Sequence, residues 1–112
     1  MKLQTDDDQL MAMAAHRYCL GRSSYIVGSC LDWLRDTWPQ MTPNTQFVIL
    51  RDTVDALAEE RAGSPTIDAP GWVEAVAWMV KAMPPDRVES VRRALAWKGK
   101  PLDEYLGKAV AP

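Results

Sequence analysis

The chain has few of the residues that build metal and catalytic sites, with one histidine and two cysteines among 112 residues. A structural zinc site needs four ligands at closely paired spacings, and this sequence has no C-x-x-C pair. His16 and Cys19 lie one helical turn apart, but no oxyanion hole or activating basic cluster accompanies them beyond Arg17 and Arg22. We therefore expect a packed thiol beside a partly exposed imidazole, with no metal, no cofactor and no enzymatic activity.

Long apolar runs and secretion signals are also missing. The longest nearly apolar stretch, residues 71–83, contains Glu74 and Lys81, and it is too short to span a bilayer, which takes about 20 apolar residues. The N-terminal residues are acidic and do not resemble a signal peptide. Cys19 and Cys30 fall in apolar helical patterns, which predicts buried, reduced thiols. These features predict a cytoplasmic protein without membrane association.

The chain lacks an excess of basic charge. Its net charge of −2 argues against a general polyanion binder. The charge is uneven, because residues 41–80 are mainly acidic whereas residues 81–112 are mainly basic. The acidic and basic parts can attract each other within one fold or between two copies, so the pattern is compatible with a homodimer.

No segment alternates apolar and polar residues as a strand does, whereas helix start signals recur along the chain. The acidic cap at residues 6–8 predicts a first helix that ends near residue 20. The second helix begins at Ser23 or Ser24 and ends before Pro39, and Gly28 inside it indicates close contact with another helix. The Thr42 cap predicts a third helix over residues 43–62.

Two further helices follow. A fourth helix over residues 69–83 is apolar almost all round, as is typical of a helix surrounded by others. A fifth helix spans residues 85–97, in which Glu89 and Arg93 are placed to pair one turn apart. A last short turn is expected over residues 101–106. We therefore predict an all-α, compact, single-domain bundle of about five helices over residues 1–112.

The third helix is the first candidate for partner binding. Four carboxylates are expected on its wet face, opposite the apolar stripe: Asp52, Asp55, Glu59 and Glu60. Exposed charges of one sign steer association with an oppositely charged partner. The hypothesis is therefore that this acidic face binds a basic surface of a bacterial protein.

Arg17 and Arg22 flank the turn between the first two helices and allow two interpretations. Arg17 can bridge to Asp52 or Asp55 as part of the fold. Alternatively, both arginines and the neighbouring tyrosines form a partner-binding surface, since Arg and Tyr are enriched at binding hot spots.

The basic C-terminal third supports the alternative function, binding of DNA or RNA. Arg92, Arg93 and Lys98 can meet phosphates, and Trp97 can stack on a base. The turn over residues 20–24 superficially suits a helix-turn-helix. The overall acidity of the chain argues against nucleic-acid binding, and the second helix carries few basic groups. Direct nucleic-acid binding is therefore the second hypothesis.

The segment RYCLGRSSYIV at residues 17–27, followed by WLRDTW and TPNTQFVILRD, resembles small bacteriophage and prophage proteins. Those carry a similar R-Y-x-L-G-R-x-x-Y segment and a later N-T-Q segment before an acidic helix. The resemblance covers about residues 10–60 and transfers no catalytic residues. It implies an accessory protein that binds and inhibits a bacterial host protein or nucleoprotein complex in the host cytoplasm. Anti-CRISPR proteins, which inhibit CRISPR effectors, are similar in size and acidity.

Overall fold

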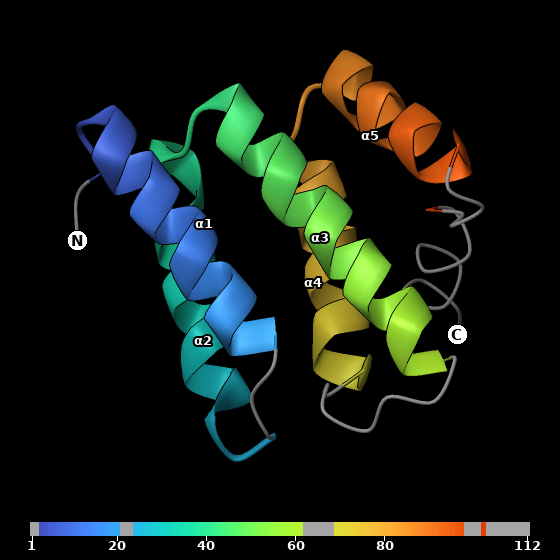
Figure 1. Ribbon diagram of the computed structural model, residues 1–112, viewed down its shortest axis with the longest axis horizontal. Coiled ribbons are helices and arrows are strands. Elements are labelled where there is room, and N and C mark those ends of the chain that lie inside the picture. The colour runs from blue at the N-terminus through green and yellow to red at the C-terminus, as the bar shows by residue number, and fades with distance from the viewer. Residues whose placement is uncertain (1–2, 21–23, 62–68, 98–101, 103–112) are drawn as a thin grey trace.

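A computed structural model describes residues 3–20, 24–61, 69–97 and 102 (Figure 1). These residues form a helical bundle without strands, as predicted. Its elements are α1 (Asp6–Leu20), α2 (Ser24–Thr37), the 3-10 helix η1 (Trp38–Gln40), α3 (Pro43–Arg61), α4 (Ala69–Lys81) and α5 (Pro85–Trp97). Within the described ranges, no helix combines the length and the apolar character that a bilayer crossing requires. The expected turn over residues 101–106 lies outside the described residues, except for Leu102, which is buried.

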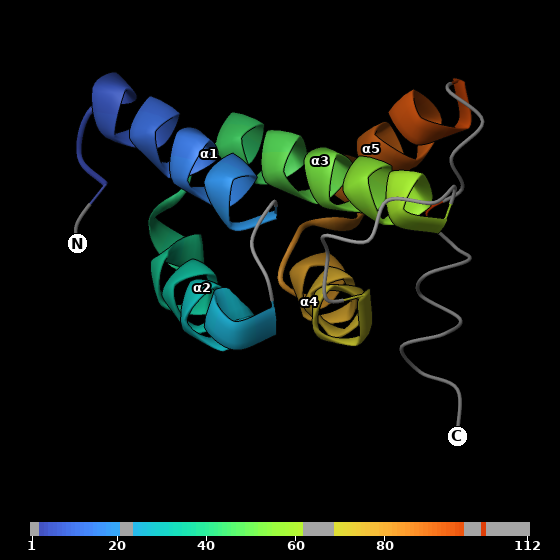
Figure 2. The same cartoon turned by 60° about the horizontal axis from the view of Figure 1, so that its bottom comes forward.

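The helices form two layers (Figure 2). Helices α1, α3 and α5 lie in one layer, and α2 and α4 lie in the other. Helix α3 packs against α1, α4 and α5, while α2 packs against α1 and α4. The centre of the bundle is therefore α3. Helix α4, which the sequence predicts to be surrounded, is also largely inaccessible, since only Glu74 is exposed within residues 71–80.

Buried threonines explain why the central helix was not recognised. Thr45 and Thr53 of α3 are fully buried although they are polar. The Thr53 hydroxyl donates a hydrogen bond to the Ile49 carbonyl at 2.8 Å, and the Thr45 hydroxyl contacts the Thr42 hydroxyl at 2.9 Å. Because these hydroxyls are satisfied locally, they can be buried beside apolar side chains, and the inward surface of α3 becomes broader than its apolar stripe.

The helix starts are fixed by threonine caps. The Asp8 backbone N–H donates to the Thr5 hydroxyl at 3.1 Å, and the Thr5 N–H donates to the Asp8 carboxylate at 3.1 Å, which closes a capping box. Hydrogen bonds from the Gln4 and Thr5 backbones lower the pKa of Asp8. The cap residue of α1 is thus Thr5, one position before the predicted acidic cap. The predicted Thr42 cap of α3 is confirmed by the bond from the Thr45 N–H at 3.2 Å.

The buried side chain of Gln9 ties α1 to the connection between η1 and α3. Its amide oxygen accepts the Thr42 N–H at 3.0 Å, and its amide nitrogen donates to the Gln40 carbonyl at 3.1 Å. The Gln40 side chain in turn accepts the Leu3 N–H at 2.9 Å. One glutamine therefore satisfies two backbone groups that have no helical partner, and it fixes where α1 begins relative to α3.

Gly28 does not mark a close helix contact, contrary to the prediction. It is exposed, and a Cβ atom built there meets nothing within 4 Å. Among the described side chains of α2, Leu34 is buried, and Cys30, Leu31 and Trp33 are half-buried against the core.

We predict that Gln9→Ala lowers the free energy of unfolding by about 1–3 kcal/mol, because it removes two part-buried hydrogen bonds, to the Thr42 N–H and to the Gln40 carbonyl. Urea denaturation of the purified protein measures this. Gln4→Ala is the matched control, since Gln4 is exposed and its replacement should change stability by less than about 0.5 kcal/mol. Equal effects of the two substitutions would contradict the role given to Gln9.

Candidate functional site

The outer face of α1 carries the large apolar side chains that the described part of the fold leaves most exposed. Leu10, Met11 and Tyr18 are each 60% exposed, and Ala14 and Arg17 lie between them on the same side of the helix. We call these five residues the outer face of α1. Contiguous exposed apolar groups on one element are typical of a protein-binding surface.

The inner face of α1 is unusually polar. Gln9 and His16 are 7% and 1% exposed, and they share the buried side with Ala12 and Cys19. Spacings of three, four and seven residues put these positions on one face of a helix. The helix therefore buries two polar side chains beside Leu20 on its inner side, while Leu10, Met11 and Tyr18 stay exposed on the outer face.

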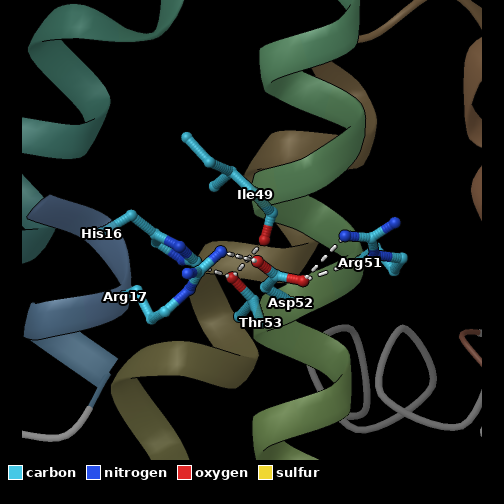
Figure 3. A network of polar contacts seen from close by, with 6 residues as sticks. All are labelled: His16, Arg17, Ile49, Arg51, Asp52 and Thr53. Atoms are coloured by element: carbon cyan, nitrogen blue, oxygen red, sulfur yellow. Dashed lines mark hydrogen bonds and ion pairs between the residues drawn. The ribbon is translucent and has the colours of Figure 1, made fainter. Parts of the chain in front are cut away.

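His16 is held in the core by a hydrogen-bond chain to α3 (Figure 3). Its Nε2 atom lies 2.8 Å from the Thr53 hydroxyl oxygen. That hydroxyl donates its single hydrogen to the Ile49 carbonyl, so it must accept from His16. The imidazole is therefore the tautomer that carries its proton on Nε2, and the expectation of a partly exposed imidazole is wrong.

The surroundings of His16 keep it neutral. Burial, together with the positive charge of Arg17, lowers its pKa from 6.5 to about 3. Its ring meets Trp72 edge to face, with centroids 5.6 Å apart. His16 Nδ1 and Trp72 Nε1 are both buried and have no hydrogen-bond partner within the part of the chain that the structure describes. A neutral ring tolerates this apolar site, whereas an imidazolium would be strongly disfavoured there.

Arg17 bridges from the outer face of α1 to α3, as one of the two sequence interpretations predicted. Its Nη2 atom lies 3.8 Å from an Asp52 carboxylate oxygen, and the other carboxylate oxygen lies 3.3 Å from Arg51. The Arg17 side chain is 72% exposed and Asp52 only 20%. One carboxylate thus faces two guanidinium groups, and this cluster, drawn in Figure 3, keeps a net positive charge.

The expected open acidic face on α3 is wrong for the two acids whose side chains are described. Asp52 and Asp55 are half-buried, and Asp52 is paired with arginines. The cause is the central position of α3, which α1 and α5 flank on either side. The side chains of Glu59 and Glu60, and all of Arg22, lie outside the described residues. Partner binding by these acids and by Arg22 stays a prediction.

A groove of about 340 Å³ opens between α1 and α2, next to the outer face. Tyr18 belongs to both surfaces, and Trp33 forms the opposite wall. The remaining lining residues are small: Ala15, Cys19, Ser29 and Cys30. We call this cavity the α1–α2 groove. Its mainly apolar lining suits an apolar side chain or a small molecule.

The two cysteines face each other across this groove. Cys19 is buried as predicted, but Cys30 is only half-buried. Burial and the hydrogen bond to Cys30 raise the pKa of Cys19 to about 12. A Cys–His nucleophile needs the opposite shifts, a stabilised thiolate and a protonatable imidazole, and His16 is committed to Thr53. Among the described residues, no three acidic, histidine or cysteine side chains gather in a way that could hold a metal ion.

The basic residues of α5 are partly neutralised. Glu89 pairs with Arg93, at 3.6 Å, as predicted, and also with Arg92. Arg87 and Arg93 are exposed. The side chain of Trp97, together with Lys98 and Lys100, lies outside the described residues.

Sequence reasoning missed Leu10 and Met11, although it considered the neighbouring tyrosine and arginine. The available signal was the seven-residue spacing between Gln9 and His16. That spacing places two polar residues on one face and leaves Leu10 and Met11 on another.

We predict that the free energy of unfolding falls as the pH drops from 7 towards 5. Below pH 6.5, His16 alone contributes up to about 1.4 kcal/mol per pH unit to this fall. The unfolded chain takes up a proton near pH 6.5, whereas folded His16 stays neutral until about pH 3. His16→Gln retains a donor for Thr53 but cannot titrate. Urea denaturation at several pH values should show a shallower slope for this variant, and parallel curves would contradict the assignment.

Comparisons of the chain with protein-family models, with curated proteins and with solved structures find no match. The likeness to phage and prophage proteins therefore rests on the sequence motif alone. The function is inferred below from the described side chains together with that motif.

Proposed function

We propose that this protein acts by binding a bacterial host protein, without catalysing a reaction, and that it docks through the outer face of α1 and the α1–α2 groove. The observation that carries the proposal is the exposure of large apolar side chains on the outer face of α1. Leu10, Met11 and Tyr18 are exposed on a helix that is anchored by buried Gln9 and His16. Burial of three such side chains against a partner contributes a few kcal/mol to binding.

The chemistry of the partner follows from the charge beside this surface. Arg17 is exposed at one end of the apolar side chains, and Asp6 and Asp7 are exposed at the other end, one turn before Leu10 and Met11. The fitting partner is an amphipathic helix that presents an apolar stripe with an acidic residue at one end and a basic residue at the other. The apolar stripe covers Leu10 and Met11, and the acidic residue meets Arg17.

In its most specific form, the proposal is inhibition of a CRISPR effector. This identification rests on the resemblance of residues 17–27 to phage and prophage proteins and on the size and acidity of the chain. The protein then works in the cytoplasm of the host cell, and its target is a protein or a nucleoprotein complex.

The alternative is nucleic-acid binding through the basic C-terminal third. Glu89 pairs with Arg92 and Arg93, so this group keeps one net positive charge, as the Arg17 cluster does. Protein binding is proposed first because the chain as a whole carries a net charge of −2, which disfavours binding to phosphates.

We predict that Leu10→Lys with Met11→Lys lowers the recovery of the host partner about tenfold or more, while the melting temperature changes little. The tagged protein is incubated with a bacterial lysate, and the captured proteins are quantified by mass spectrometry. The matched control is Ala82→Lys with Ala96→Lys, which adds the same charge at two exposed sites outside α1. Undiminished capture by the α1 variant would refute the docking surface.

The proposal that the protein inhibits a CRISPR effector is tested in cells. Expression of the protein in a strain whose CRISPR system targets a phage should restore plaque formation. The α1 variant should not restore it, and the control variant should. Restoration by the α1 variant at the wild-type level would separate the activity from this surface.

We predict that Arg17→Glu weakens partner binding several-fold at low salt and has a small effect on folding, since an exposed ion pair contributes at most about 1 kcal/mol. Arg93→Glu makes the same charge change at an exposed position of α5 and should leave partner binding unchanged. Titrations with the captured partner, at low and high salt, measure both. Loss of binding with Arg93→Glu alone would favour the nucleic-acid alternative.

A further inference from the structure

Two thiols from different helices meet in the α1–α2 groove. Cys19 lies in the last turn of α1 and is 8% exposed, whereas Cys30 of α2 is half-buried. Both line the groove, so the two side chains border the same small cavity. A disulfide between them requires a local adjustment that brings the sulfur atoms to about 2.05 Å.

We propose that Cys19 and Cys30 are a dithiol modification site that reacts with low-molecular-weight disulfides and closes into an intramolecular disulfide between α1 and α2. The inference is independent of the proposed function, because it concerns the chemistry of the groove and not its partner. The groove, at about 340 Å³, is large enough to admit a small disulfide.

The burial of the two residues sets the order of the steps. Cys30 is the more accessible thiol, so its thiolate attacks one sulfur of the small disulfide. The S–S bond of that disulfide breaks, one small thiol leaves, and Cys30 carries a mixed disulfide. Cys19 then loses its proton and attacks the Cys30 sulfur, which releases the second small thiol. Two protein thiols are oxidised, and one small disulfide is reduced to two thiols.

The environment of Cys19 gives it the second step of this sequence. Burial raises the pKa of Cys19 to about 12, so very little of it is thiolate at neutral pH. Cys19 is therefore a poor target for outside reagents and acts as the resolving thiol, which reacts once Cys30 has been modified beside it.

The test uses the full chain, folded, with excess glutathione disulfide as the probe. Samples are quenched in acid, digested with trypsin without reduction and examined by mass spectrometry. Cleavage after Arg17, Arg22 and Arg35 puts Cys19 in residues 18–22 and Cys30 in residues 23–35. The expected product is the pair of these peptides joined by a disulfide, and dithiothreitol should release it.

Two conservative variants, checked for folding by circular dichroism, assign the roles. Cys19→Ser should trap a stable glutathione adduct on Cys30, because the resolving thiol is gone. Cys30→Ser should be modified at least tenfold more slowly than Cys19→Ser. A glutathione adduct that persists on the wild-type chain, or wild-type thiols that react only after denaturation, would overturn the proposal, as would equal labelling rates in the two variants.

Discussion

The rotation of α1 about its own axis is fixed by two buried polar side chains, Gln9 and His16, and the character of the exposed surface follows from it. Hydrophobicity alone would turn Leu10 and Met11 inward, since burial of each contributes about 1.5–3 kcal/mol. The observed rotation instead satisfies the backbone groups of Thr42 and Gln40 and the hydroxyl of Thr53. A buried polar group without a partner costs about 1–3 kcal/mol, which is comparable with the gain from burying one apolar side chain, and the same rotation also buries Leu20.

The hydrogen-bond chain from His16 to α3 also determines what the core can do chemically. Because the Thr53 hydrogen is given to the Ile49 carbonyl, the imidazole must act as a donor, and burial keeps it neutral. The only histidine of the chain is thus a structural link between α1 and α3. Its position one turn from Cys19 comes from the shared inner face of α1 and does not create a nucleophile–base pair.

The helices could be predicted from the sequence because their signals are local. The Thr42 cap and Pro43 act within one turn, and the structure starts α3 there. The rotation of α1 could not be predicted in the same way, because its anchors are distant in sequence: Gln9 and Thr42 are 33 residues apart, and His16 and Thr53 are 37 apart. The Arg17–Asp52 pair could be predicted from charge, but the half-burial of Asp52 depends on how α1 and α5 flank α3.

The same packing changes the charge expected at the docking surface. An open acidic face on α3 would favour a basic partner, such as the nucleic-acid channel of an effector. In the structure, Asp52 is shared by Arg17 and Arg51, and the outer side of α1 carries exposed carboxylates one turn before Leu10 and an exposed guanidinium at its other end. An apolar surface between an acidic and a cationic end is complementary to an amphipathic helix with the opposite charge at each end. If the target is a nucleoprotein complex, the contact proposed for α1 therefore lies on its protein surface and away from the channel that holds the nucleic acid.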